Sequence, residues 1–243
     1  MIDVSDKDSY IVDIFRVKGG AHHVYSLHGP EGEVETEGLS LTDQPKGTLA
    51  GEDVEPYADL GFMKDNGADA TGYQYLYDVR RDSKPGAQPS ITYKVVDTWH
   101  VTPPSPPYQG GAKGGSDVRL RMTLVNPPGE VILAHGDPPR NKPGNPKNLW
   151  YILLPHEASE STFVTVIEPY VGSRLISKIE RKDDGDTVTL TITTASGRVD
   201  TIVSALEPIR REVAGVDFAG VFGVISKHNG KAELRLSASE DEN

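Results

Sequence analysis

Three histidines stand close together near the start of the chain, at positions 22, 23 and 28. Imidazole is the commonest metal ligand, so the group raises the possibility of a zinc site. On an extended strand side chains alternate, which places His22 and His28 on one face roughly 20 Å apart and His23 on the other. A metal would therefore need a bulge or a ligand from another strand, such as His100 or His135. We expect no metal or other cofactor, and the simplest interpretation is hydrogen-bonded histidines lining a sheet.

Other residues have side chains that could contact a sugar. Arg16 could pair with a substrate carboxylate, or with a residue on a neighbouring strand. The pairs Trp99-His100 and Trp150-Tyr151 carry aromatic rings that could stack on a pyranose. Aromatic residues in strands more often belong to a core or an interface, so both roles stay open for these pairs.

Motifs for other chemistry are weak. The glycine-rich run 110–116 contains a lysine and ends in serine, but it lacks the spacing and the strand–helix context of a phosphate-binding loop. No Gly-x-Ser-x-Gly sequence is present, so nothing supports a serine hydrolase of that type.

The elements that must position these residues are strands. The run 187–194 alternates threonine with Val188, Leu190 and Ile192, as a half-buried strand does. Asn229-Gly230 is a typical hairpin turn. Such segments predict an all-β fold: a large antiparallel β-sandwich with long connecting loops and little helix. Further strands are expected at 10–17, 22–28, 74–81, 91–101, 118–125, 130–135, 149–155, 162–170, 174–181, 198–203, 222–226 and 232–236.

Helical periodicity is nearly absent. The best candidate, 203–213, is interrupted by Pro208, so at most a short helix or turn is expected there. Long connections are expected at 41–72, 102–117 and 137–147, where binding rims are often found. We expect one β-sandwich domain over residues 1–236, followed by a frayed acidic tail over 237–243.

Composition limits the possible partners. The chain has 243 residues, no cysteine and a formal net charge of −11, which argues against nucleic acid as a partner. No apolar run is long enough to span a bilayer, so we expect no membrane partner. The N-terminal residues show neither the basic nor the apolar region of a signal peptide.

Five segments follow one another along the chain: YIVDIFRVKGG (10–20), HHVYSLH (22–28), KGTLAG (46–51), VILAHGDPPR (131–140) and STFVTVIEPY (161–170). Together they resemble the C-terminal β-sandwich region of heparinase II/III-like polysaccharide lyases. The resemblance covers roughly residues 10 to 182. It concerns the scaffold, because none of the family's catalytic residues can be matched to a position in this chain.

The resemblance implies a role in β-elimination of uronic-acid polysaccharides, such as glycosaminoglycans or alginate. That reaction needs a base, a group that neutralises the carboxylate, and an acid for the leaving oxygen. In the family most of these groups lie on an α-helical toroid. The chain is therefore expected to be a β-sandwich fragment or subunit, not catalytic alone, whose partners are such a toroid and a polysaccharide. Its location would then be periplasmic or secreted.

Six residues are expected to bind substrate or line the interface with the toroid. Tyr25, with Leu27, would supply apolar contact, while His23 and His28 would reach the cleft rim. The full set is His23, Tyr25, His28, Arg16, Trp99 and Trp150. Two alternatives remain open: a free-standing carbohydrate-binding or adaptor sandwich without lyase activity, and an autonomous lyase that uses tyrosine and histidine.

Overall fold

The computed structural model of the chain describes residues 1–58, 72–96, 117–138 and 146–238. Within these ranges the chain forms sixteen β-strands and one three-residue 3₁₀ turn, η1 (Tyr73–Tyr75). The predicted all-β class with little helix is confirmed. No helix in the described ranges has the length and apolar character needed to cross a membrane.

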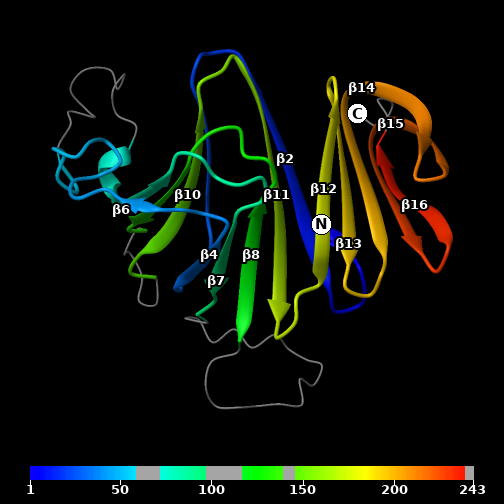
Figure 1. Cartoon of the computed structure of the whole chain (residues 1–243), viewed down its shortest axis with the longest axis horizontal. Helices are drawn as coiled ribbons and strands as arrows, with labels where there is room; N and C mark the ends of the chain where they lie inside the picture. The colour runs from blue at the N-terminus through cyan, green and yellow to red at the C-terminus, as the bar shows by residue number, and fades with distance from the viewer. Residues whose placement is uncertain (59–71, 97–116, 139–145, 239–243) are drawn as a thin grey trace. The chain divides into compact units, whose positions relative to one another are not determined.

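The strands pair into three antiparallel sheets (Figure 1). Across sheet I the order is β1 (Ile2–Asp3), β2 (Ser9–Lys18), β11 (Glu160–Val171), β8 (Val118–Leu124), β7 (Ser90–Lys94) and β4 (Val34–Glu37). Across sheet II the order is β3 (His23–His28), β10 (Leu149–His156), β9 (Val131–Gly136), β6 (Leu76–Asp82) and β5 (Thr42–Asp43). Sheet III contains β12 (Ile176–Asp184), β13 (Thr187–Thr194), β14 (Val199–Val213), β15 (Val216–His228) and β16 (Lys231–Ala238).

The chain divides into two compact units. Unit 1 comprises Met1–Ile2 and Tyr10–Gly172, and unit 2 comprises Asp3–Ser9 and Ser173–Asn243. The single domain expected over residues 1–236 stays a prediction, because two compact units can still unfold together. Residues 239–243 of the expected acidic tail lie outside the described part, whereas β16 already includes residues 237 and 238.

Unit 1 is a sandwich of sheets I and II. Alternation along β10 turns Trp150, Ile152 and Leu154 into the main core and leaves Tyr151 and Leu153 on the other face of sheet II. Residues of both sheets make up this core, so the apolar rows of the two sheets bury each other. The buried members of the main core are Tyr25, Ile91, Tyr93, Met122, Leu124, Val131, Leu133, Trp150, Ile152, Leu154 and Phe163.

The second face of sheet II is covered as well. Ile132 and Leu153 belong to a smaller core on this face, against which Leu49 and Tyr73 pack. Leu49 belongs to the segment 46–51, whose Thr48 forms backbone bridges with Gly51 and with Tyr77 of β6. This segment therefore covers part of the second face of sheet II.

Unit 2 is built on sheet III. Its strands follow chain order across the sheet, as consecutive hairpins do. One face carries a core of Val203, Val213, Phe218 and Ile225. Gly223 is required here, because a side chain at that position would overlap the ring of Phe218.

Several predictions about elements need correction. Residues 203–213 are neither helix nor turn but part of β14, which accommodates Pro208 at a register shift between Ser204 and Ile209. The short strands β1, β4 and β5 were not predicted, since they carry too few residues for alternation to be visible. Most of the expected loops at 102–117 and 137–147, and half of the strand expected at 91–101, lie outside the described residues.

The packing of Tyr93 predicts the effect of a glycine substitution. Gly29→Ala should destabilise the protein by about 1–3 kcal/mol, because the new methyl group would overlap the fully buried ring of Tyr93. Gly86→Ala is the matched control, since its methyl group would make only an ordinary van der Waals contact with the carbonyl oxygen of Gly38. Urea unfolding of both variants checks this; equal midpoints would show that the Tyr93 site tolerates the group.

Candidate functional site

His23 and Tyr25 point into unit 1. Both lie on the edge strand β3 of sheet II and are buried, at 6% and 8% exposure. The Tyr25 ring stacks on Phe163, with centroids 5.4 Å apart, and its hydroxyl donates a hydrogen bond to Asp13. The ring of Tyr25 is therefore already covered by the sandwich core, and the expected contact with a toroid stays a prediction.

The other predicted residues lie elsewhere. His28 is exposed on the opposite face of β3, where its ring lies 5.1 Å from that of Tyr151. Arg16, on β2, is three residues from Asp13 and so faces the other side of sheet I. Trp99 lies outside the described residues. His23 and Tyr25 thus share the interior face of β3, whereas His28 and Arg16 lie on the other faces of their sheets. Trp150 belongs to the same main core as Tyr25.

Ser161, at the start of β11, is held between two histidines. Its Oγ lies 2.7 Å from His23 Nδ1 and 2.9 Å from His156 Nδ1, while His23 Nε2 lies 2.6 Å from the carbonyl oxygen of Gly19. A carbonyl can only accept, so His23 Nε2 carries the hydrogen. In the neutral ring Nδ1 then accepts from the Ser161 hydroxyl, whose oxygen is left to accept from His156. We call Gly19, His23, His156 and Ser161 the Ser161 network.

The Ser161 network is a structural link. It joins β3, β10 and β11, which belong to different sheets of the sandwich. Ser161 is only 5% exposed and its hydroxyl is fully engaged, so it is not placed as a nucleophile. Next to the network, the exposed side chain of Glu157 contacts His22.

Trp150 lies at the centre of a different cluster. The ring of His135 packs against its indole at a centroid distance of 3.6 Å. The guanidinium carbon of Arg80 lies 5.0 Å from the indole centroid, in cation–π geometry. All three residues face the interior side of sheet II, on adjacent strands β10, β9 and β6.

Tyrosines and carboxylates extend this group towards solvent. Tyr77 donates to Asp137 at 2.6 Å, and Tyr57 donates to the other oxygen of the same carboxylate. Tyr57 and Tyr75 are 52% and 47% exposed, with ring centroids 5.7 Å apart. His135 also contacts Asp78 at 3.0 Å. The Trp150 cluster, as we name it, consists of Tyr57, Tyr75, Tyr77, Asp78, Arg80, His135, Asp137 and Trp150.

Burial raises the pKa of two tyrosine hydroxyl groups. It raises the pKa of Tyr77 to about 12, and the hydrogen bond to Asp137 acts in the same direction. Burial likewise raises the pKa of Tyr25, helped by its hydrogen bond to Asp13. Both phenols therefore stay protonated at neutral pH and act as hydrogen-bond donors.

The sequence identified only part of this cluster. Trp150 was singled out for sugar contact and His135 only as a possible metal ligand. The missed signal was the density of aromatic residues in Tyr73-Gln74-Tyr75-Leu76-Tyr77. Among the described residues, no group of three or more histidine, aspartate or glutamate side chains is arranged to hold a metal ion.

Comparison with known proteins gives no assignment. No protein-family model matches the chain, and no curated protein matches it.

The Ser161 network predicts a stability effect. Ser161→Ala should lower the free energy of unfolding by about 1–3 kcal/mol, because buried His23 loses its partner at Nδ1. Ser177→Ala is the control, since the exposed Ser177 hydroxyl bonds only the carbonyl oxygen of Thr193. Chemical denaturation measures both; a loss no larger in Ser161→Ala than in the control would contradict a linking role.

Proposed function

We propose that the chain is the β-sandwich component of a heparinase II/III-like polysaccharide lyase and that its Trp150 cluster binds the uronic-acid polymer. The observation that carries the proposal is the gathering of exposed tyrosine rings, a cation and carboxylates around one buried indole. Catalytic groups would come from an α-helical toroid, in the same polypeptide or in a second chain. The segments that resemble the lyases support the family part of the proposal.

Arg80 is the group suited to a uronate carboxylate. Its guanidinium is 43% exposed and is positioned by the Trp150 ring. Its ion-pair partner is Asp43, 3.2 Å away and 79% exposed. Such surface pairs contribute only about 0–1 kcal/mol, so a substrate carboxylate can replace Asp43 at little cost. The planar guanidinium can then bind both carboxylate oxygens.

The tyrosines suit the sugar ring and its hydroxyl groups. The exposed rings of Tyr57 and Tyr75 offer flat apolar surface to a pyranose face. The hydrogen bonds that Tyr57 and Tyr77 donate to Asp137 hold both phenols at the site, where the carboxylate of Asp137 can also accept from sugar hydroxyl groups. The cluster thus offers stacking, hydrogen-bond acceptors and a cation together.

The same groups are poorly suited to cleavage. A base that removes the proton next to the carboxylate works best with a pKa near the operating pH. The pKa values of Tyr77 and Tyr25 are raised further above neutral pH, which disfavours the phenolate form that a base requires. The hydroxyl of Ser161 is already hydrogen-bonded to two histidines. We therefore assign binding to this chain and cleavage to a partner segment.

A free-standing carbohydrate-binding module is the second candidate. One observation favours it: the whole Trp150 cluster lies within unit 1, so sugar binding would not need a further domain. The two candidates differ in whether a helical toroid associates with the chain.

Substitutions of two neighbouring arginines test the sugar site. Arg80→Ala should weaken binding of alginate or heparan sulfate oligosaccharides roughly tenfold or more, because a charge-assisted hydrogen bond is lost. Arg81→Ala is the matched control: it is the next residue on β6, is similarly exposed and pairs instead with Glu130. Isothermal titration calorimetry of the intact chain measures both affinities.

Equal affinities for the two variants would reject Arg80 as the carboxylate ligand. A second arm measures the absorbance of unsaturated product, and we expect none from the chain alone. Turnover that is lost in Tyr25→Phe or His23→Gln would instead establish an autonomous lyase.

A further inference from the structure

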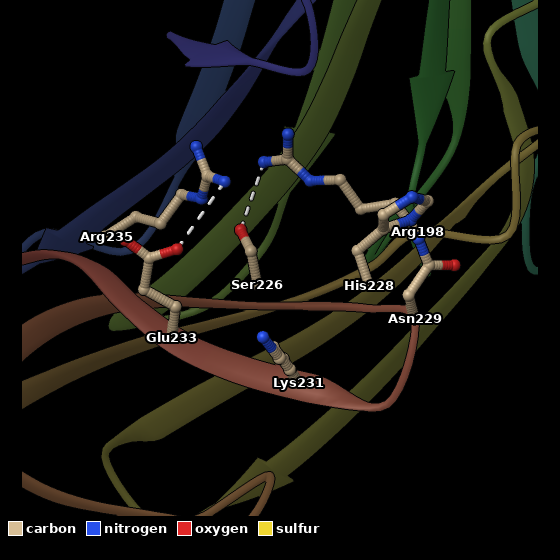
Figure 2. A pocket seen from close by; sticks show the side chains of 7 residues that line it. All are labelled: Arg198, Ser226, His228, Asn229, Lys231, Glu233 and Arg235. Atoms are coloured by element: carbon tan, nitrogen blue, oxygen red, sulfur yellow. Dashed lines mark hydrogen bonds and ion pairs between the residues drawn. The ribbon is translucent and has the colours of Figure 1, made fainter.

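Unit 2 contains a pocket of about 360 Å³ at one end of sheet III (Figure 2). Every side chain that lines it is polar or charged. The lining comes from Arg198, just before β14, and from β15, β16 and the turn between these two strands. The charged and hydrogen-bonding ends of these side chains point to a polar or ionic ligand.

Arg198 forms a fixed wall of the pocket. Its side chain is buried and its Nε lies 2.8 Å from Asp200, which is fully buried. One terminal nitrogen donates to the carbonyl oxygens of Asp3 and Val4, and the other donates to Ser226 at 3.0 Å. Because Asp200 compensates its charge, Arg198 shapes the pocket without giving it net positive charge.

The net charge comes from the rim on β16. Lys231, Glu233 and Arg235 alternate along the strand and so share one face. The Glu233–Arg235 pair is 3.7 Å long with both side chains well exposed, so it is weak and can rearrange. Lys231 has no ion pair within the described part of the chain, and Figure 2 shows its ammonium group pointing into the pocket.

We propose that this pocket binds an oxyanion, the sulfate or phosphate group of a larger ligand. Lys231 and Arg235 are the direct ligands, and the side chains of His228 and Asn229 at the turn supply further hydrogen bonds. Two cations face one carboxylate on the rim, which gives local positive charge in a chain of net charge −11. The inference does not rest on the sugar site of unit 1, since the two share no residue.

The experiment is a titration of the full chain with sodium sulfate, followed by amide NMR shifts at ionic strength held constant with sodium chloride. We expect saturable shifts at Asn229 and Lys231, and roughly tenfold weaker binding in Lys231→Ala. Lys178→Ala on β12, whose lysine pairs with Glu180 outside the pocket, should bind as the unaltered chain does. A parallel titration with inorganic phosphate shows which oxyanion is preferred.

Two glutamate variants distinguish anion binding in the pocket from a general effect of the chain's net charge. Glu233→Gln should tighten sulfate binding several-fold, because it frees Arg235 and removes the rim carboxylate. Glu180→Gln makes the same change of charge beside Lys178 and should leave binding unchanged. The proposal is overturned if neither anion gives saturable shifts, or if the two glutamate variants respond alike. Arg80→Ala should not alter sulfate binding, so failure here is distinct from failure of the sugar site.

Discussion

The indole of Trp150 is the constraint on which the arrangement of unit 1 depends. It belongs to the main core between sheets I and II, and the backbone carbonyl oxygen of Trp150 accepts a 2.9 Å hydrogen bond from the buried hydroxyl of Tyr93. The same ring supports His135 and Arg80. Side chains that reach solvent are therefore positioned by a core residue, and little conformational entropy is lost when they bind a ligand.

Unit 2 uses a buried ionic network for a comparable purpose. The Arg198–Asp200–Ser226 group satisfies nearly all of its donors internally, as a buried ion pair must. Its geometry fixes one wall of the pocket, while Lys231, Glu233 and Arg235 on β16 remain exposed and adaptable. In unit 1 a buried ring thus positions a partly exposed arginine, whereas in unit 2 the buried group forms the wall beside the exposed cations of β16.

The sequence allowed the fold class and most strands to be predicted, because alternation is a local property. The run 187–194 is a clear case: every apolar residue in it is buried. Alternation could not reveal that 203–213 continues a long strand, since Pro208 suggested a break that β14 absorbs at a register shift. The Trp150 cluster depends on the pairing of β9 with both β6 and β10, which brings Arg80 beside Trp150 although they are 70 positions apart in sequence. Such pairing is set by topology, so within the cluster the sequence pointed to sugar contact only for Trp150.

The central claim is that acidic sugar binds at Trp150. The chain contains two tryptophans, so Trp99→Phe leaves Trp150 as the sole indole reporter. Titration of this variant with a uronic-acid oligosaccharide, followed by the indole N–H resonance, tests the claim directly. We expect a saturable shift with the acidic oligosaccharide and a much smaller one with a neutral oligosaccharide of the same length. Binding that leaves the Trp150 resonance unmoved would contradict it.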